Sequence, residues 1–203
     1  MKSSTRPRVT SRQHGAALIE ALVSVLILSI GLLGMVGLQT SAIRYEQNSW
    51  ARTAVSNQVS DIADRIRANP DTVINGYTYT PTYTIERAAI DTNPSTVFNI
   101  ATDCLTVPCN AAQLTTFDLT QWRRNLNTRI PGSVGFISGD SNSAYNVSIA
   151  WFDKSWLVDG DATALQQATQ CTAAMTTVAA RNCCPAGLEA PVGVRCVNFS
   201  VIP

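Results

Sequence analysis

The chain has 203 residues, of which 45% are apolar, and its 15 basic and 14 acidic residues nearly cancel. This length and composition suit a single folded domain with an appendage. Four of the basic residues lie among the first 15, and without them the net charge falls to about −3, which argues against general nucleic-acid binding.

An uncharged apolar run from Ala21 to Leu38 dominates the N-terminal part of the chain. As a helix, these 18 residues span about 27 Å, and residues 16–19 extend them to a hydrocarbon core of about 30 Å. A buried helix of a soluble protein seldom stays free of charge for so long, and the apolar part of a secretory signal is shorter. We therefore predict a membrane-spanning helix in preference to these two alternatives.

The charges that flank this run predict its orientation. Four basic and no acidic residues precede it, whereas the first charges after it, Arg44 and Glu46, cancel. By the positive-inside rule the N-terminus stays in the cytoplasm and the remainder is exported. We expect a single-pass protein of the bacterial inner membrane whose C-terminal domain is periplasmic.

The helix is predicted to continue outward over residues 39–69. Apolar residues step by three and four through this segment, as in an amphipathic helix, and Asn69-Pro70 is the first firm stop. A helix from residue 16 to about residue 68 would be roughly 80 Å long. Residues 70–203 then form the globular domain.

Alternation and turn residues predict the elements of this domain. Asn75-Gly76 indicates a turn, and Tyr77, Tyr79, Tyr83 and Ile85 alternate around Pro81 as in an edge strand. A loop rich in Thr, Asn and Asp follows. Strands are predicted at residues 146–151 and 194–201.

A second helix is predicted before the strand at residues 146–151. Asp118 can cap its N-terminus, and Pro131-Gly132 ends it. Its apolar face comprises Leu119, Trp122, Leu126 and Ile130. The predicted class is α+β, with helix packed on an antiparallel sheet.

All six cysteines fall in the exported part: Cys104, Cys109, Cys171, Cys183, Cys184 and Cys196. Thiols are oxidised in a bacterial periplasm, so disulfides are the favoured interpretation. Cys104 and Cys109 are spaced for a small closed loop, but the spacing leaves the pairing as a whole open. A four-cysteine zinc site is the alternative, although no CxxC pair occurs.

No catalytic constellation is apparent. The only histidine, His14, precedes the apolar run, and no phosphate loop or dinucleotide motif occurs, so we predict neither an enzyme nor a cofactor. The triplet Asp159-Gly160-Asp161 lacks the spacing of a calcium loop and is interpreted as a turn. Arg123, Arg124 and Arg129 are interpreted as a solvated helix face. Trp122 and Trp151 are interpreted as core anchors.

Three stretches together resemble the PilV family of type IV minor pilins, also called type IV pilus modification proteins. They are "GAALIEALVSVLILSIGLLGMVGLQ", "CNAAQLTTFDLTQWRRNLNTRIPG" and "YNVSIAWFDKS". The resemblance implies a type IV pilin-like fold and a leader at residues 1–15 that a prepilin peptidase removes between Gly15 and Ala16. It also implies methylation of the new Ala16 amine, although the family usually has Phe at this position.

Glu20 would be costly in hydrocarbon unless a cation approached it. Cleavage would leave a cationic amine on Ala16, about 6 Å of helix rise away. Contact within one helix is awkward, whereas the amine of a neighbouring subunit can reach Glu20. Such pairing would set the axial register of a filament core built from residues 16–38. The alternative is that Glu20 lies at the headgroup level of an ordinary anchor.

The resemblance implies a structural subunit that primes pilus assembly within a tip-associated complex. Its implied partners are the prepilin peptidase, other minor pilins, the major pilin, a tip adhesin and the inner-membrane assembly platform. Twitching motility, adhesion and DNA uptake are the associated behaviours. Two alternatives are a type II secretion pseudopilin and a single-pass anchored periplasmic binding protein that is never cut at Gly15.

Overall fold

The computed structural model describes residues 14–72, 76–161 and 163–203. Residues 1–13 of the predicted leader and Asn75 of the predicted turn lie outside the described residues. The chain divides into two compact units, Met1–Asn48 and Ser49–Pro203.

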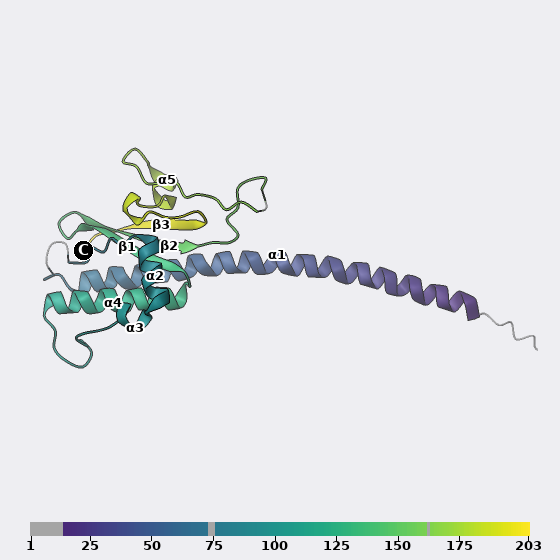
Figure 1. Cartoon of the computed structure of the whole chain (residues 1–203), viewed down its shortest axis with the longest axis horizontal. Coiled ribbons are helices and arrows are strands. Elements are labelled where there is room, and N and C mark those ends of the chain that lie inside the picture. Colours follow the sequence, from purple (N-terminus) through teal and green to yellow (C-terminus); the bar gives the residue numbers. More distant parts are fainter. Residues whose placement is uncertain (1–13, 73–75, 162) are drawn as a thin grey trace, which may run out of the picture. The chain divides into compact units, whose positions relative to one another are not determined.

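Helix α1 runs without a break from His14 to Ala68 (Figure 1). This confirms the predicted continuation of the apolar helix through residues 39–68 and its end before Asn69-Pro70. Every third or fourth residue of its C-terminal part is buried in the second unit, and these residues are Val55, Val59, Ile62 and Ile66. Apolar spacing predicted this segment correctly because a helix presents one stripe to the core.

Two short helices, α2 (Tyr83–Thr92) and α3 (Pro94–Val97), replace part of the predicted edge strand and loop. Tyr79 pairs with Ile137 of β1 through an isolated bridge, and Thr78 Oγ1 donates to the Gly139 carbonyl of the same strand. The prediction of a strand through Tyr83 and beyond was wrong. Alternation ends at Pro81, and the Glu-Arg-Ala-Ala sequence that follows favours helix.

Helix α4 runs from Ala111 to Arg129. Its N-cap is Asn110, which forms a reciprocal capping box with Gln113. The prediction that Asp118 caps the helix was therefore wrong, because Asp118 lies in the second turn and is buried. The predicted apolar face is confirmed. Trp122, Leu126 and Ile130 are buried, and Leu119 packs beside them.

The sheet has three antiparallel strands in the order β1-β2-β3. Strands β2 (Ala144–Phe152) and β3 (Val194–Val201) were predicted, whereas β1 (Ser133–Asp140) was not. Glycines 135 and 139 interrupt the alternation of β1. At Gly135 the ring of Trp122 occupies the space that a side chain would need.

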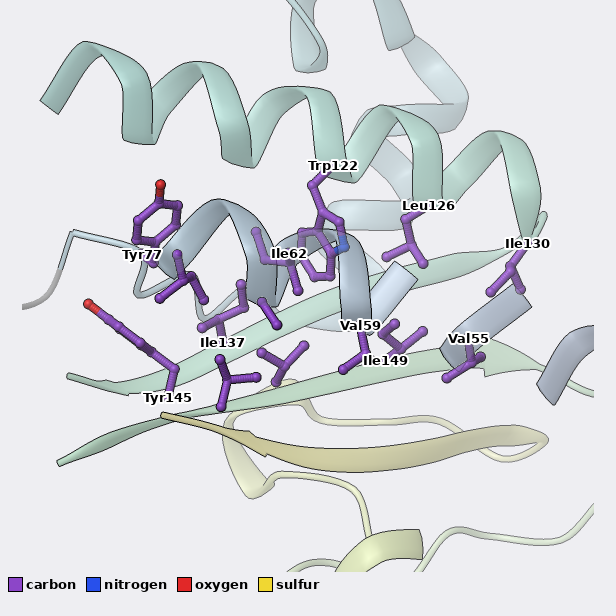
Figure 2. Packing of buried hydrophobic residues seen from close by; sticks show 14 of the residues in the cluster. Val55, Val59, Ile62, Tyr77, Trp122, Leu126, Ile130, Ile137, Tyr145 and Ile149 are labelled. Atoms are coloured by element: carbon purple, nitrogen blue, oxygen red, sulfur yellow. The ribbon is translucent and has the colours of Figure 1, made fainter. Parts of the chain in front are cut away.

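The two faces of the sheet bury two hydrophobic clusters. One face packs against α1 and α4, with Trp122, Ile137 and Ile149 fully buried at its centre (Figure 2). The C-terminal segment covers the opposite face, where Phe136 and Val194 contact Leu188 and Cys184. This segment holds α5 (Thr177–Asn182) and the 3₁₀ helix η1 (Ala186–Leu188). The fold is therefore α+β, with the helix packed on an antiparallel sheet as predicted.

Candidate functional site

The apolar segment Leu18–Thr40 of α1 is the first candidate site. It is 23 residues long, none of it is buried, and by length and composition it can cross a membrane. Its large apolar side chains are all at least half exposed, from Val23 at 51% to Leu38 at 74%. An apolar surface that surrounds a whole helix needs lipid or protein around it.

The hydroxyl groups of this segment are satisfied within the helix itself. Ser24 Oγ donates to the carbonyl of Glu20 at 2.8 Å, Ser29 Oγ to that of Leu26 at 2.7 Å, and Thr40 Oγ1 to that of Val36 at 2.9 Å. Such bonds let Ser and Thr enter an apolar environment, since no polar hydrogen is left without an acceptor.

The carboxylate of Glu20 differs from these hydroxyls. It has no hydrogen-bond or ion-pair partner among the described residues, and it is the sole charged group of Leu18–Thr40. Residues 16 and 20 are four apart, and this spacing places them on one face of a helix. The backbone of Gly15 and Ala16 belongs to α1, and the Ala16 side chain lies outside the described residues.

The six cysteines form three disulfides, Cys104–Cys109, Cys171–Cys183 and Cys184–Cys196. The predicted small loop at Cys104 and Cys109 is confirmed. The other two bonds resolve what the spacing left open, and each adjacent cysteine of the 183–184 pair joins a different partner. No group of three metal-ligating side chains occurs in the described part of the chain.

Asn198 of β3 anchors the C-terminal cystine segment to the sheet. Its Nδ2 donates to the carbonyls of Ala180 at 2.7 Å and Cys183 at 2.8 Å, and its Oδ1 accepts from Ser148 Oγ at 2.5 Å. Sequence analysis missed this residue, because an asparagine within a strand gives no sign of distant partners.

Arg65, Asp118 and Tyr77 join α1 to α4 at a buried polar joint. Asp118 accepts from Arg65 Nη1 at 2.9 Å and from the Tyr77 hydroxyl at 2.8 Å. Burial of the Tyr77 ring raises the pKa of its phenol far above the ordinary value. Asp61 holds the other side of the guanidinium at 3.0 Å. We interpret the joint as structural, since the Arg65 guanidinium, the Asp118 carboxylate and the Tyr77 hydroxyl are hydrogen-bonded to one another.

Arg123 does not lie on the solvated helix face that was predicted, whereas Arg124 and Arg129 are exposed as expected. Arg123 pairs with Glu86 of α2 and lies 4.4 Å from the centre of the Tyr79 ring. Arg124 donates to the carbonyl of Phe98 at 2.5 Å. The difference at Arg123 arises because α2, which was not predicted, places Glu86 beside it.

Other predicted residues lie where they were expected. Trp122 and Trp151 are core residues with 0% and 8% exposure. Asp159-Gly160-Asp161 is a turn, in which Gly160 has a φ of 85° and Asp161 accepts bonds from Thr163. These bonds lower the pKa of Asp161 below its usual value.

Comparison with known proteins adds no relative. The chain matches no protein-family model, no curated protein and no solved structure. The function proposed below is therefore supported by the exposed apolar helix, its carboxylate and the packing of the second unit.

Proposed function

We propose that this protein is a minor pilin of a type IV pilus, of the PilV family. The observation that carries the proposal is one unbroken helix, α1, whose segment Leu18–Thr40 is wholly exposed and contains one unpaired carboxylate, Glu20. The continuation of the same helix is packed into a folded unit. A plain membrane anchor needs neither the carboxylate nor helical continuity between the anchor and the core.

The packing of the second unit supports the proposal further. Asp118 and Trp122 belong to the Asp-Leu-x-x-Trp stretch on which the resemblance rests, and Asp153 ends the Trp-x-Asp stretch. Each of the three fixes one element to another: Asp118 holds Arg65, Trp122 Nε1 donates to the carbonyl of Gln58, and Asp153 holds Arg195. These contacts hold the fold together, so proteins with the same fold would be expected to keep these two sequence stretches.

The proposed mechanism depends on charge pairing between subunits. The prepilin peptidase cuts after Gly15 on the cytoplasmic face and leaves an amine on Ala16, which is then methylated. When the helix enters a bundle with other minor pilins and the major pilin, the amine of a neighbour pairs with Glu20. Because the bundle is apolar, any other axial register leaves both charges unpaired, which costs several kcal/mol.

The exported unit would make lateral contacts with other minor pilins and a tip adhesin, above the inner-membrane assembly platform. The protein would thereby prime filament growth for twitching motility, adhesion or DNA uptake. A type II secretion pseudopilin shares the same helix, and the secretion or pilus partner recovered with the protein separates the two.

Replacement of Glu20 tests the proposal. We expect Glu20→Ala and Glu20→Gln to be cleaved normally but to be absent from sheared pili, because the neighbouring amine loses its partner. Glu46→Ala, a matched loss of an exposed carboxylate beyond the apolar segment, should be incorporated like the wild type. Normal incorporation of both Glu20 variants would refute the role of this carboxylate.

The mature N-terminus separates the proposal from the anchored binding protein. Intact mass and N-terminal sequencing of protein extracted from membranes should give a start at Ala16. Native material that retains Met1 would overturn the pilin interpretation, because no new amine would exist to pair with Glu20.

A further inference from the structure

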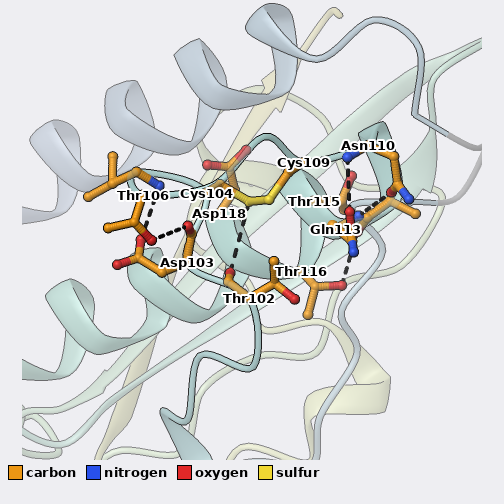
Figure 3. Close-up of a disulfide and its surroundings, with 12 residues drawn as sticks. Thr102, Asp103, Cys104, Thr106, Cys109, Asn110, Gln113, Thr115, Thr116 and Asp118 are labelled. Atoms are coloured by element: carbon orange, nitrogen blue, oxygen red, sulfur yellow. Dashed lines mark hydrogen bonds between the residues drawn. A yellow bond between two sulfur atoms is a disulfide. The ribbon is translucent and has the colours of Figure 1, made fainter.

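The disulfide loop Cys104–Cys109 is held rigid by several independent interactions. The carbonyl of Asp103 accepts from the amide of Thr106 at 3.0 Å (Figure 3) and from that of Val107 at 3.1 Å, and its carboxylate accepts from the amide of Leu105 at 3.0 Å. Cys109 is bonded covalently to Cys104 and directly precedes the capping box of α4. The loop therefore has little conformational freedom to lose on binding.

This rigid loop presents apolar side chains to solvent. Leu105 is 78% exposed, more than any other large apolar residue described, and Val107 is 46% exposed. Neither side chain belongs to the two hydrophobic clusters of the fold. Exposed Leu105 does not stabilise the fold by burial, and together with Val107 it gives this fixed loop an apolar surface that another molecule can contact.

A groove of about 750 Å³ lies beside the loop, between α3, α4 and the chain that connects them. Its apolar wall comprises Phe98, Ile100 and Leu105. Its polar wall includes Gln121, Arg124 and Asn127 of α4. A groove with one apolar and one polar wall suits an extended peptide, whose side chains and backbone need both.

Arg124 supplies the charge that selects the occupant. The partly buried arginines 65, 87, 123 and 195 each contact a carboxylate. Arg124 is exposed, has no carboxylate partner among the described residues, and donates to the Phe98 carbonyl. The groove therefore holds a guanidinium that can receive a carboxylate with bidentate geometry. Asp103 also lines the groove, but its carboxylate is engaged with Leu105.

We propose that this groove and loop bind an extended segment of a different exported protein. The segment carries an apolar side chain, which rests on Leu105 and Ile100, and an Asp or Glu close by in sequence, which pairs with Arg124. The inference goes beyond the proposed function and does not depend on Glu20 or on cleavage at Gly15. Assembly through the apolar helix and this contact on the second unit are separate interactions.

Photo-crosslinking in cells tests the contact with the full-length protein. Benzoylphenylalanine replaces Leu105 in one strain and, as a control, Ile85 of α2, which is 70% exposed. We expect position 105 to give one discrete adduct with another protein, whose crosslinked peptide contains an acidic residue within a few positions. Position 85 should not give this adduct.

Charge variants make the test specific. Arg124→Glu should reduce the adduct at position 105 at least tenfold, whereas Arg129→Glu, a matched reversal at an exposed position of α4, should leave it unchanged. Arg124→Gln keeps a donor for the Phe98 carbonyl and should also reduce the adduct, so the test survives if the glutamate variant misfolds. An adduct that is insensitive to both Arg124 variants, or that joins two copies of this chain or lipid, would overturn the proposal.

Discussion

The buried joint between α1 and α4 allows a quantitative prediction for Asp118→Asn. The Asp118 side chain is 7% exposed and accepts two hydrogen bonds, from Arg65 and from the Tyr77 hydroxyl. The amide keeps the shape of the carboxylate, but it removes the charge and places an NH₂ group against a donor. Hydrogen bonds to charged groups contribute about 1.5–3 kcal/mol. Asp61 still compensates Arg65, so we expect a loss of about 2–3 kcal/mol in the free energy of unfolding.

The assay is urea unfolding of the full chain in detergent micelles, followed by tryptophan fluorescence. For a unit of this size the same loss corresponds to a fall of roughly 5–10 °C in Tm. Asp64→Asn is the matched control, since Asp64 is 79% exposed and lies 3.7 Å from Arg67. It should cost less than about 0.5 kcal/mol.

A double-mutant cycle decides whether the effect belongs to the pair. Arg65→Met combined with Asp118→Asn should show a coupling energy of about 1 kcal/mol or more. If Asp118→Asn destabilises no more than Asp64→Asn, or if the coupling energy is close to zero, the joint does not hold α4 on α1 and the reasoning fails.

Two further perturbations follow from packing and from charge. Gly135→Ala would place a methyl group against the buried Trp122 ring and should cost about 1–3 kcal/mol, whereas Gly187→Ala meets only ordinary contacts and should be nearly neutral in the same unfolding assay. Burial alone would raise the pKa of Asp153, but bonds from Ser155 and Arg195 outweigh it and lower the pKa. Its stabilisation is therefore present above the unfolded pKa of about 3.9 and disappears as pH falls through the folded value. Asp153→Asn should flatten the loss of stability between pH 5 and pH 2, and an unchanged pH profile would contradict this.

The spacing of apolar residues correctly predicted the elements that bury one regular face in the core. The apolar run of α1, the stripe on α4 and the alternation in β2 and β3 each recur at the spacing of the structure they form. Strand β1 was not predicted because a glycine, Gly135, interrupts its alternation. Glycine is needed there because the ring of Trp122, 13 positions earlier in the chain, occupies the space of a side chain. The residues of β1 are therefore determined by packing against α4 and do not follow the residue preferences of β-strands.

The candidate sites could likewise be predicted only where their chemistry lies within one stretch of sequence. The exposed apolar helix and Glu20 were identifiable because their chemistry is unusual within a single stretch of sequence. Arg123 and Asp118 were misassigned because their partners, Glu86 and Arg65, lie 37 and 53 residues away. Charged residues at helical spacing resemble a solvated face until the covering element is known. The groove beside Arg124 likewise exists only after α3 and the disulfide loop are in place.

The joints between α1 and the rest of the second unit have a mechanical consequence. They are spread along the helix axis: the Gln58 carbonyl receives Trp122 Nε1, Arg65 holds Asp118, and Asn69 Nδ2 donates to Thr115 at 3.0 Å. A pull along the axis therefore loads all three in shear at the same moment, instead of peeling them apart one after another. We therefore expect force along the axis to unfold this unit at a rate set by the simultaneous loss of these contacts, and not by its equilibrium stability.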